Sequence, residues 1–444
     1  MSFTPESLEQ LQTIAIQSDI RFIRLQFTDL MGTVKVVEVP VRKLMKTFSN
    51  RIRFDGSSIE GFLRLEESDM FLHPDLSTWA VLPWPVNGGR VARLICEAYL
   101  PDETPFMGDP RRILKNVLEE GQDLKLNDLG VSTEIEFYLL EVEADGTASH
   151  RLSDQGGYFD VAPIDLGERC RRDLVLRSVE LGIPAASSHH EGSPGQHEVD
   201  VAPLPAVAAA DAVVSFKMAA RVISKHHHLY ATFMPRPYTS SLGSGLHLRF
   251  HAPTGTPLAN PEDPFGLSGQ GKSFVAGILK HARALTAVTN PTVNSYKRLR
   301  PRSEAPLFTV WSNRAQAPLV RVTATEKDQT VIEVRSPDPA CNPYLSLAVL
   351  LQAGLDGVQQ SLPLPSPLHE DPFQMPVEAR LRRGILPLPN TLEEAIQALE
   401  EDEVVQAALG AHASNRYMRA KLLEWEMYSG EIHPWERDQY LTRS

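Results

Sequence analysis

Hydrophobic and polar residues alternate over much of the first hundred residues, as they do in half-buried strands. Ile23, Leu25 and Phe27 occupy every second position, a turn follows at 29–32, and valines then resume the alternation at 34 and 36. A helix that ends near Ser18 precedes this predicted hairpin. One helix and a hairpin of this size indicate a small α+β module.

A polar, turn-rich stretch at 101–109 separates this module from the rest of the chain. We therefore expect a first domain over residues 1–104 and a larger one over 105–444. Residues 132–142 alternate as a strand, and the C-terminal residues 433–440 are aromatic enough to predict a tail that docks on a surface. Apolar residues at helical spacing, together with capping signals, predict further helices over 111–126, 211–230, 272–290 and 342–360, and one opening at Thr391.

Composition places the chain among ordinary globular proteins. Of 444 residues, 42% are hydrophobic and 23% charged, and the net charge is −12, which disfavours general binding to nucleic acid or to an anionic membrane. The three cysteines are far apart and predict neither a disulfide framework nor a zinc site. The first residues lack the pattern of a signal peptide, so we expect a cytoplasmic protein.

The strand at 132–142 carries the most informative chemistry. Its alternation puts Ile135 and Phe137 on one face and Glu134 and Glu136 on the other. Two neighbouring carboxylates repel each other. Two explanations of this carboxylate pair are equally good: a sheet face exposed to solvent, or a divalent cation bound by both carboxylates.

Four later segments are ambiguous when each is taken alone. Residues 189–198 gather histidines and glutamates around a rigid turn, and 243–247 place two glycines before His247. Residues 294–306 concentrate positive charge in an acidic chain, which suits recognition of a carboxylate or phosphate. On a strand, Glu333 and Arg335 would share a face. A simple surface ion pair, which contributes little to stability, would explain this pattern as well.

Taken together and in order, these segments resemble the bacterial type of the glutamine synthetase family. The matching strings are FDGSSIEGF (54–62), GGYFDVAPIDLG (156–167), HHEGSPGQHEVD (189–200), ATFMPRP (231–237), GSGLH (243–247), NPTVNSYKRL (290–299), IEVRSPDPACNPYLSLAVLLQAGLDG (332–357) and HPWERDQY (433–440). The resemblance implies an α+β protein with a small β-grasp N-terminal domain and a large α/β catalytic domain. It also implies an assembly of two stacked hexameric rings, a dodecamer.

The implied reaction joins glutamate and ammonium at the expense of ATP, through γ-glutamyl phosphate. It uses two Mg²⁺ or Mn²⁺ ions per subunit and involves neither nucleic acid nor a membrane. By position, one cation corresponds to Glu136, Glu191 and Glu198, and the other to Glu134, His247 and Glu333.

The resemblance also assigns roles to other residues. Glutamate binding corresponds to Gly243, His247, Arg298 and Arg335. Asp55 corresponds to the residue that deprotonates ammonium, with Ser58 beside it, and Tyr158 and Glu304 to groups that enclose the ammonium and shield the acyl phosphate. Arg298 is also expected to act in catalysis. Arg321 corresponds to a phosphate-site arginine, and Arg64 to one that mediates feedback by glutamine in one subclass.

Departures from the family cluster at the expected nucleotide edge. Gln316 and Val331 stand where the family has phosphate-directed arginines, Ala186 replaces an acidic residue, and Arg249 occupies a position near the nucleotide. Charge lost from a phosphoryl-transfer site is costly, although Arg249 offers a replacement. Three interpretations remain open: a glutamate–ammonia ligase, a γ-glutamyl ligase for another amine, and a weak or silent paralogue with a regulatory role.

Overall fold

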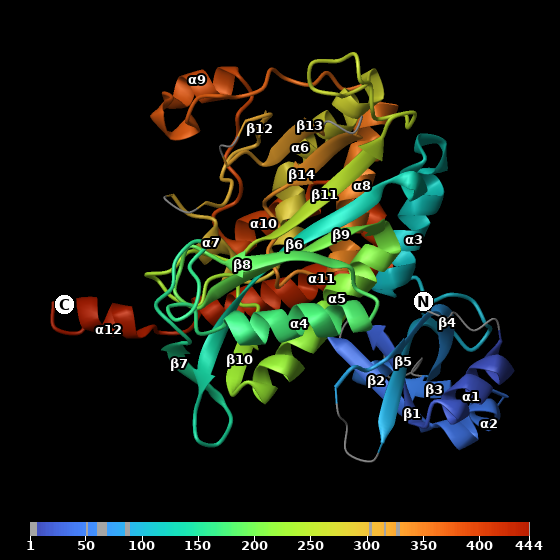
Figure 1. Cartoon of the computed structure of the whole chain (residues 1–444). Helices are drawn as coiled ribbons and strands as arrows, with labels where there is room; N and C mark the ends of the chain where they lie inside the picture. Colours follow the sequence, from blue (N-terminus) through green and yellow to red (C-terminus); the bar gives the residue numbers. More distant parts are fainter. Residues whose placement is uncertain are drawn as a thin grey trace.

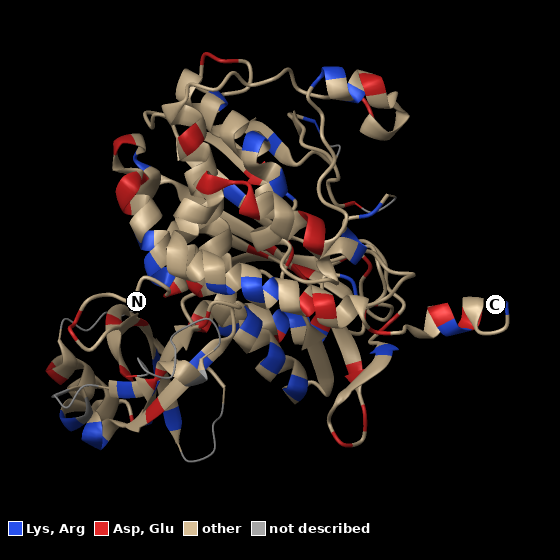
Figure 2. Ribbon diagram, turned by 180° about the vertical axis from the view of Figure 1, so that it is seen from behind, with Lys and Arg blue, Asp and Glu red and all other residues tan. Residues whose placement is uncertain are grey.

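A computed structural model describes residues 7–49, 52–59, 69–84, 89–301, 304–314, 317–325 and 329–443. The chain forms a small N-terminal domain and a larger domain built around a long, curved sheet (Figure 1). None of the helices within the described ranges combines the length and apolar character needed to cross a bilayer. Acidic and basic residues are interspersed over the helices seen in Figure 2.

The N-terminal domain is a five-stranded sheet in the order β2–β1–β5–β4–β3, with β1 parallel to β5 and the other pairs antiparallel. The predicted hairpin is confirmed as β1 and β2. The helix expected before it ends at Gln17, and Ser7 caps its start by accepting a hydrogen bond from Gln10 N at 3.2 Å. The elements are α1 (Leu8–Gln17), β1 (Ile20–Thr28), β2 (Val34–Pro40), α2 (Leu44–Ser49), β3 (Ile52–Asp55), β4 (Asp69–Val81) and β5 (Arg90–Tyr99).

The second domain contains a nine-stranded sheet, ordered β12–β13–β14–β11–β6–β9–β8, with β7 and β10 also paired to β6. The predicted strand at 132–142 is confirmed as the long central strand β6. The bounds are β6 (Gly130–Val142), β7 (Ala148–Leu152), β8 (Ala185–His190), β9 (Gln196–Pro205), β10 (Leu229–Thr232), β11 (Leu246–Pro253), β12 (Trp311–Ser312), β13 (Val320–Thr325) and β14 (Gln329–Val334).

Helices cover one face of this sheet and leave the other to the polar side chains of β6. Ile135 and Phe137 are buried in the main hydrophobic core. The helices α6 and α8 approach so closely that a Cβ on Gly277 would lie 2.1 Å from the Ala353 carbonyl oxygen, which excludes any larger residue there. The bounds are α3 (Pro110–Glu120), α4 (Glu168–Glu180), α5 (Ala206–His226), α6 (Gly269–Thr289), α7 (Ser295–Arg298), α8 (Pro343–Gln359), α9 (Val377–Arg382), α10 (Leu392–Glu400), α11 (Glu403–Ser429) and α12 (Pro434–Tyr440).

Buried polar contacts join the two domains. The guanidinium of Arg111 on α3 pairs with Asp75 and Glu97 of the small domain and with Asp211 of α5, at 2.8, 2.7 and 3.1 Å. At a second point, Asn342 caps α8 by accepting from Tyr344 N at 3.1 Å. Its Nδ2 donates to the carbonyl oxygens of Asp29 and Leu30 at 3.2 and 3.3 Å.

We expect Asn342→Ala to lower the free energy of unfolding by about 2 kcal/mol, because it removes a helix cap and takes a donor from the buried carbonyl groups of Asp29 and Leu30, of which Asp29 keeps Gly32 N. Urea unfolding followed by circular dichroism measures the change. Asn415→Ala, at an exposed helix position, is the matched control and should stay within about 0.5 kcal/mol of the parent protein. Equal losses in both variants would contradict this role of the cap.

The C-terminal helix α12 extends away from the body of the chain (Figure 1). Trp435 and Tyr440 are 63% and 57% exposed, and their rings contact each other at 5.9 Å between centroids. Both rings are largely exposed, and docking of this tail stays a prediction.

Candidate active site

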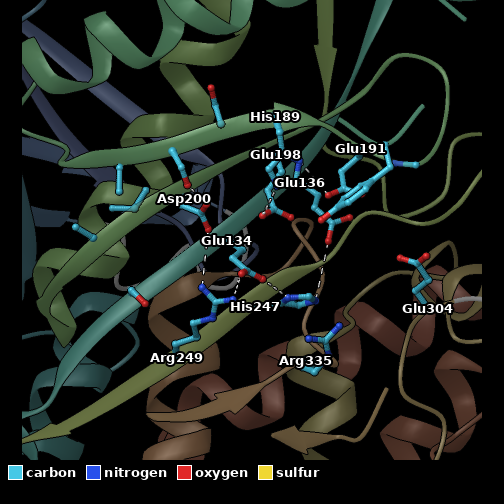
Figure 3. A pocket seen from close by; sticks show the side chains of 18 of the residues that line it. Glu134, Glu136, His189, Glu191, Glu198, Asp200, His247, Arg249, Glu304 and Arg335 are labelled. Atoms are coloured by element: carbon cyan, nitrogen blue, oxygen red, sulfur yellow. Dashed lines mark hydrogen bonds and ion pairs between the residues drawn. The ribbon is translucent and has the colours of Figure 1, made fainter. Parts of the chain in front are cut away.

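A polar cavity of about 1010 Å³ opens on the face of the sheet opposite the core (Figure 3). Its walls come from β6, β8, β9, β11, β13 and the loops around Tyr158, Glu191 and Glu304. Its lining includes charged, histidine and aromatic side chains, namely Glu134, Glu136, Tyr158, His189, Glu191, Glu198, Asp200, His247, Arg249, Glu304, Arg321 and Arg335.

Strand register brings these side chains together. Glu134 on β6 lies opposite His247 on β11, and Glu136 lies opposite Glu198 on β9. Glu198 in turn lies opposite His189 on β8. Since residues opposite each other on paired strands point to the same face, each register pair adds a ligand-type side chain to one wall of the cavity.

The first group is the acidic cluster, which we define as Glu136, Glu191 and Glu198. His189 joins it, with its Nδ1 3.4 Å from Glu191 Oε1 and its Nε2 3.4 Å from Glu198 Oε1. Burial raises the pKa of the Glu136 and Glu191 carboxyl groups and raises the pKa of Glu198 to about 7. Buried carboxylates crowded in this way gain from a cation, and three oxygen ligands suit Mg²⁺ or Mn²⁺.

The second group is the arginine-bound cluster, which we define as Glu134, His247, Glu333 and Arg249. His247 Nδ1 lies 2.5 Å from Glu134 Oε2 and 3.4 Å from Glu333 Oε1. The guanidinium of Arg249 pairs with Glu134, and its Nε lies 3.7 Å from Glu333 Oε1. Burial, and then the nearby Arg335, lower the pKa of His247 to about 4, so the imidazole is neutral.

Glycines allow the two groups to approach each other. A Cβ on Gly245 would lie 3.0 Å from both Glu136 Oε1 and His247 Nε2. A Cβ on Gly243 would lie 2.5 Å from Cγ of Arg298. Only glycine leaves room for these side chains, which accounts for the two glycines before His247.

Several residues with expected roles line the cavity, and others do not. Tyr158 lies at the rim, 61% exposed and stacked on Phe159, with Glu304 on the rim as well. Arg335 and Arg321 line the wall. Arg298 is buried outside the lining, and its guanidinium donates to the carbonyl oxygens of Ser336 and Arg335 at 2.6 and 3.2 Å. It is therefore placed to hold the strand end that carries Arg335.

Asp55 belongs to the N-terminal domain and does not line the cavity of its own chain. Its carboxylate accepts from Ser57 N at 2.9 Å and from Ser57 Oγ at 2.6 Å. Gln316, Arg64 and the side chain of Ser58 lie outside the described residues.

Two residues of the site were not assigned a role from the sequence. His189 lies close enough to Glu191 and Glu198 for the three side chains to bind one metal ion. Asp200 lies equally close to Glu134 and Glu198. The alternation through 196–200 would have put Asp200 on the same face as Glu198. The position of His189 depends on the pairing of β8 with β9, for which the sequence offers no local signal.

A buried network supports the loops of the cavity from behind. Asp154 Oδ1 accepts from His190 Nε2 at 3.0 Å and from the backbone of Gly156 and Gly195 at 3.1 and 2.7 Å. Although desolvation opposes it, hydrogen bonding to His190 lowers the pKa of Asp154. This network ties the loop that precedes Tyr158 to the loop that follows Glu191.

We expect Mn²⁺ to stabilise the protein more at pH 8 than at pH 5.5. In the metal-free fold the pKa of Glu198 is about 7, above its usual 4.5, so its contribution to stability is present below about pH 4.5 and lost as the pH rises to about 7. A bound cation replaces the proton and relieves this loss. Melting temperatures with and without Mn²⁺ at both pH values measure the effect.

The Glu198→Gln variant provides the control, because it removes the titrating group and should weaken the pH dependence of the Mn²⁺ effect. A Mn²⁺-induced rise in melting temperature that is the same at pH 5.5 and pH 8 would contradict the expectation.

Comparisons with known proteins agree with this geometry. The model of the glutamine synthetase β-grasp domain matches residues 19–101, and that of the glutamine synthetase catalytic domain matches residues 107–440. A glutamine synthetase from Staphylococcus aureus is 48% identical over 98% of this chain and 98% of its own length. One from Staphylococcus epidermidis is 46% identical over 100% of this chain and 99% of its own.

Solved structures have the same fold. A GmaS–ADP complex superposes with a TM-score of 0.85 at 30% identity, covering 97% of this chain and 99% of its own. A cryo-EM structure of Plasmodium falciparum glutamine synthetase has a TM-score of 0.85 at 21% identity, covering 99% of both chains. The fold, the two matched domain models and the relatives that span nearly the whole chain establish that this protein belongs to the glutamine synthetase family of ligases.

Proposed function

We propose that this protein makes glutamine from glutamate and ammonia, with the conversion of ATP to ADP and phosphate. An oxygen of the glutamate γ-carboxylate attacks the γ-phosphorus of ATP, and ADP leaves. The nitrogen of ammonia then attacks the acyl carbon, phosphate leaves, and a proton passes from nitrogen to a carboxylate. The observation that carries the proposal is the convergence of carboxylates and arginines on one cavity beside Tyr158 and Glu304.

The residues of the cavity divide this work by charge. Glu136, Glu191 and Glu198 offer oxygen ligands to Mg²⁺ or Mn²⁺, which when bound would offset the negative charge of the transferring phosphate. Arg335 and Arg321 attract the carboxylate and phosphate of the substrates. At the rim, Tyr158 and Glu304 would hold the ammonium and limit the access of water to the acyl phosphate.

Asp55 would act from a neighbouring chain. It sits at the end of β3 in the small domain and is absent from the lining of its own chain's cavity, so an assembly is needed to bring it to a site. This is consistent with the expected ring-shaped oligomer, in which the exposed α12 would pack on another subunit.

A γ-glutamyl ligase for another amine is the second candidate. The exposure of Tyr158 favours it, because it leaves the acceptor side of the cavity open. A weak or silent paralogue is the third, favoured by the nonpolar Val331 and Ala186 near the expected nucleotide edge. The retention of Glu304 at the rim supports ammonium over a bulky amine.

A product assay separates the three candidates. Metal-loaded protein is incubated with glutamate, ATP and either ammonium or a panel of primary amines, and the amide products are identified by mass spectrometry. Glutamine formed with the highest kcat/KM supports the proposal. A substituted amide formed more efficiently supports the second candidate, and bound metal without any product supports the third.

A further inference from the structure

The carboxylates of the arginine-bound cluster already have cationic partners. Its two carboxylates, Glu134 and Glu333, face three guanidinium groups. Arg335 Nη1 donates to Glu333 Oε1 at 3.1 Å, and Arg321 Nη1 lies 3.9 Å from Glu333 Oε2. Arg249 pairs with both carboxylates. A third carboxylate, Asp200, has its Oδ1 3.9 Å from Arg249 Nη1, so the three guanidinium groups balance three carboxylates before any metal is considered.

The acidic cluster has the opposite balance. Its three carboxylates, Glu136, Glu191 and Glu198, make their described ion pairs within 4.0 Å only to histidines. His189, which contacts Glu191 and Glu198, supplies at most one positive charge. The cluster therefore keeps a net negative charge, and the carboxylate of Asp200 lies beside it.

Arg249 owes its position to the sheet. It follows His247 by two residues on β11 and therefore points to the same face. In the register of the sheet it lies opposite Glu333 on β14 and two residue pairs away from Glu134 on β6. A planar guanidinium with five donors can bridge two carboxylates from this place, as a hard cation would. Figure 3 shows Arg249 reaching toward Glu134 beside His247.

We propose that Arg249 takes the place of one of the two divalent cations, so that each chain binds a single Mg²⁺ or Mn²⁺, at the acidic cluster. A metal at the other cluster would have to take the Glu134 oxygen from Arg249 and add two positive charges where guanidinium groups already balance the carboxylates. This inference deepens the proposed function, since it concerns the same cavity. Its test counts bound ions and does not depend on turnover.

The experiment titrates the purified full-length protein with Mn²⁺ and measures free Mn²⁺ by electron paramagnetic resonance, with calorimetry as a second readout. We expect one Mn²⁺ per chain in the wild type. Arg249→Ser should raise this to two, because it frees the Glu134 carboxylate and removes one of the three guanidinium groups around the cluster. Arg151→Ser is the matched control, since Arg151 is 60% exposed and pairs with Glu141 and Glu143 outside the cavity, and it should leave the count at one.

A second pair of variants keeps the inference testable if Arg249→Ser does not fold. Glu136→Gln should abolish the single Mn²⁺ of the wild type, whereas Glu134→Gln should leave it. Circular dichroism verifies that each variant is folded. Two Mn²⁺ per chain in the wild type would overturn the inference, as would loss of the single ion in Glu134→Gln alone. Failure of the proposed function would appear separately, as a missing glutamine product with the Mn²⁺ count at one.

Discussion

Replacing Glu136 by glutamine is expected to lower kcat/KM for glutamine formation by about two to three decades. Removing one preorganised charged contact from a site that develops charge costs on the order of 2–4 kcal/mol. Glu136 belongs to the acidic cluster and lies on the central strand β6, where its Oε1 is 4.0 Å from His247 Nε2 of the arginine-bound cluster. In the wild type, Gln196 Nε2 donates to Glu136 Oε2 at 3.1 Å. The glutamine amide has the same shape, and its oxygen can accept the same hydrogen bond, so the fold should persist.

The same strand offers a matched control. Glu141 lies near the other end of β6, on the surface, and pairs with Arg151 at 2.6 Å. Glu141→Gln removes a carboxylate from the same element and should change kcat/KM by less than about twofold. Steady-state kinetics with glutamate, ammonium and ATP measure both variants. Equal activities in the two variants would show that the acidic cluster does not take part in the reaction.

Restoring arginine at positions 316 and 331 is expected to raise kcat/KM for ATP by about two decades. Each position lacks a charge-assisted contact to phosphate that the family resemblance implies. The two gains need not add, because both contacts act on one phosphate chain. The structure adds a reason for Val331, since it lies on β14 two residues before Glu333 and so shares its face. A guanidinium there would extend the row of Arg249, Arg321 and Arg335.

Val331→Met with wild-type Gln316 is the control, because it fills a similar volume without charge. It should leave kcat/KM for ATP unchanged. If the double variant has unchanged or reduced kcat/KM while the wild type turns over at about 10 per second, the arginines already present supply the missing charge. A wild type without ligase activity that stays inactive in the double variant would favour the silent paralogue.

Local pattern predicts elements best where the side chains themselves mark the boundaries. The alternation of β6 placed Glu134 and Glu136 on one face without further information. The helix expected at 342–360 has its start at Asn342, whose side chain caps it. By contrast, the helix expected at 211–230 begins earlier, at Ala206, after Pro205, which makes no side-chain cap. The helix expected at 111–126 ends before Gly121, which disfavours continuation.

The pairing of Arg249 with Glu134 was not predictable in the same way. It depends on the register of β11 against β6, which brings together residues more than a hundred positions apart. The sequence marked Arg249 only as an unusual residue near the expected phosphate site. The family resemblance assigned a role to Asp55, which stays a prediction because Asp55 does not line the cavity of its own chain.

The placement of Glu134 and Glu136 on one strand also limits how the site can change during evolution. Two residues of an extended strand span about 6.8 Å, and this repeat belongs to the backbone, so no side-chain substitution alters it. Substitutions can therefore change what the acidic cluster and the arginine-bound cluster bind, but not the distance between them. An arginine in one centre is a change of this kind: a single codon can exchange a dissociable ion for a permanently attached charge, which neither chelators nor metal starvation can remove.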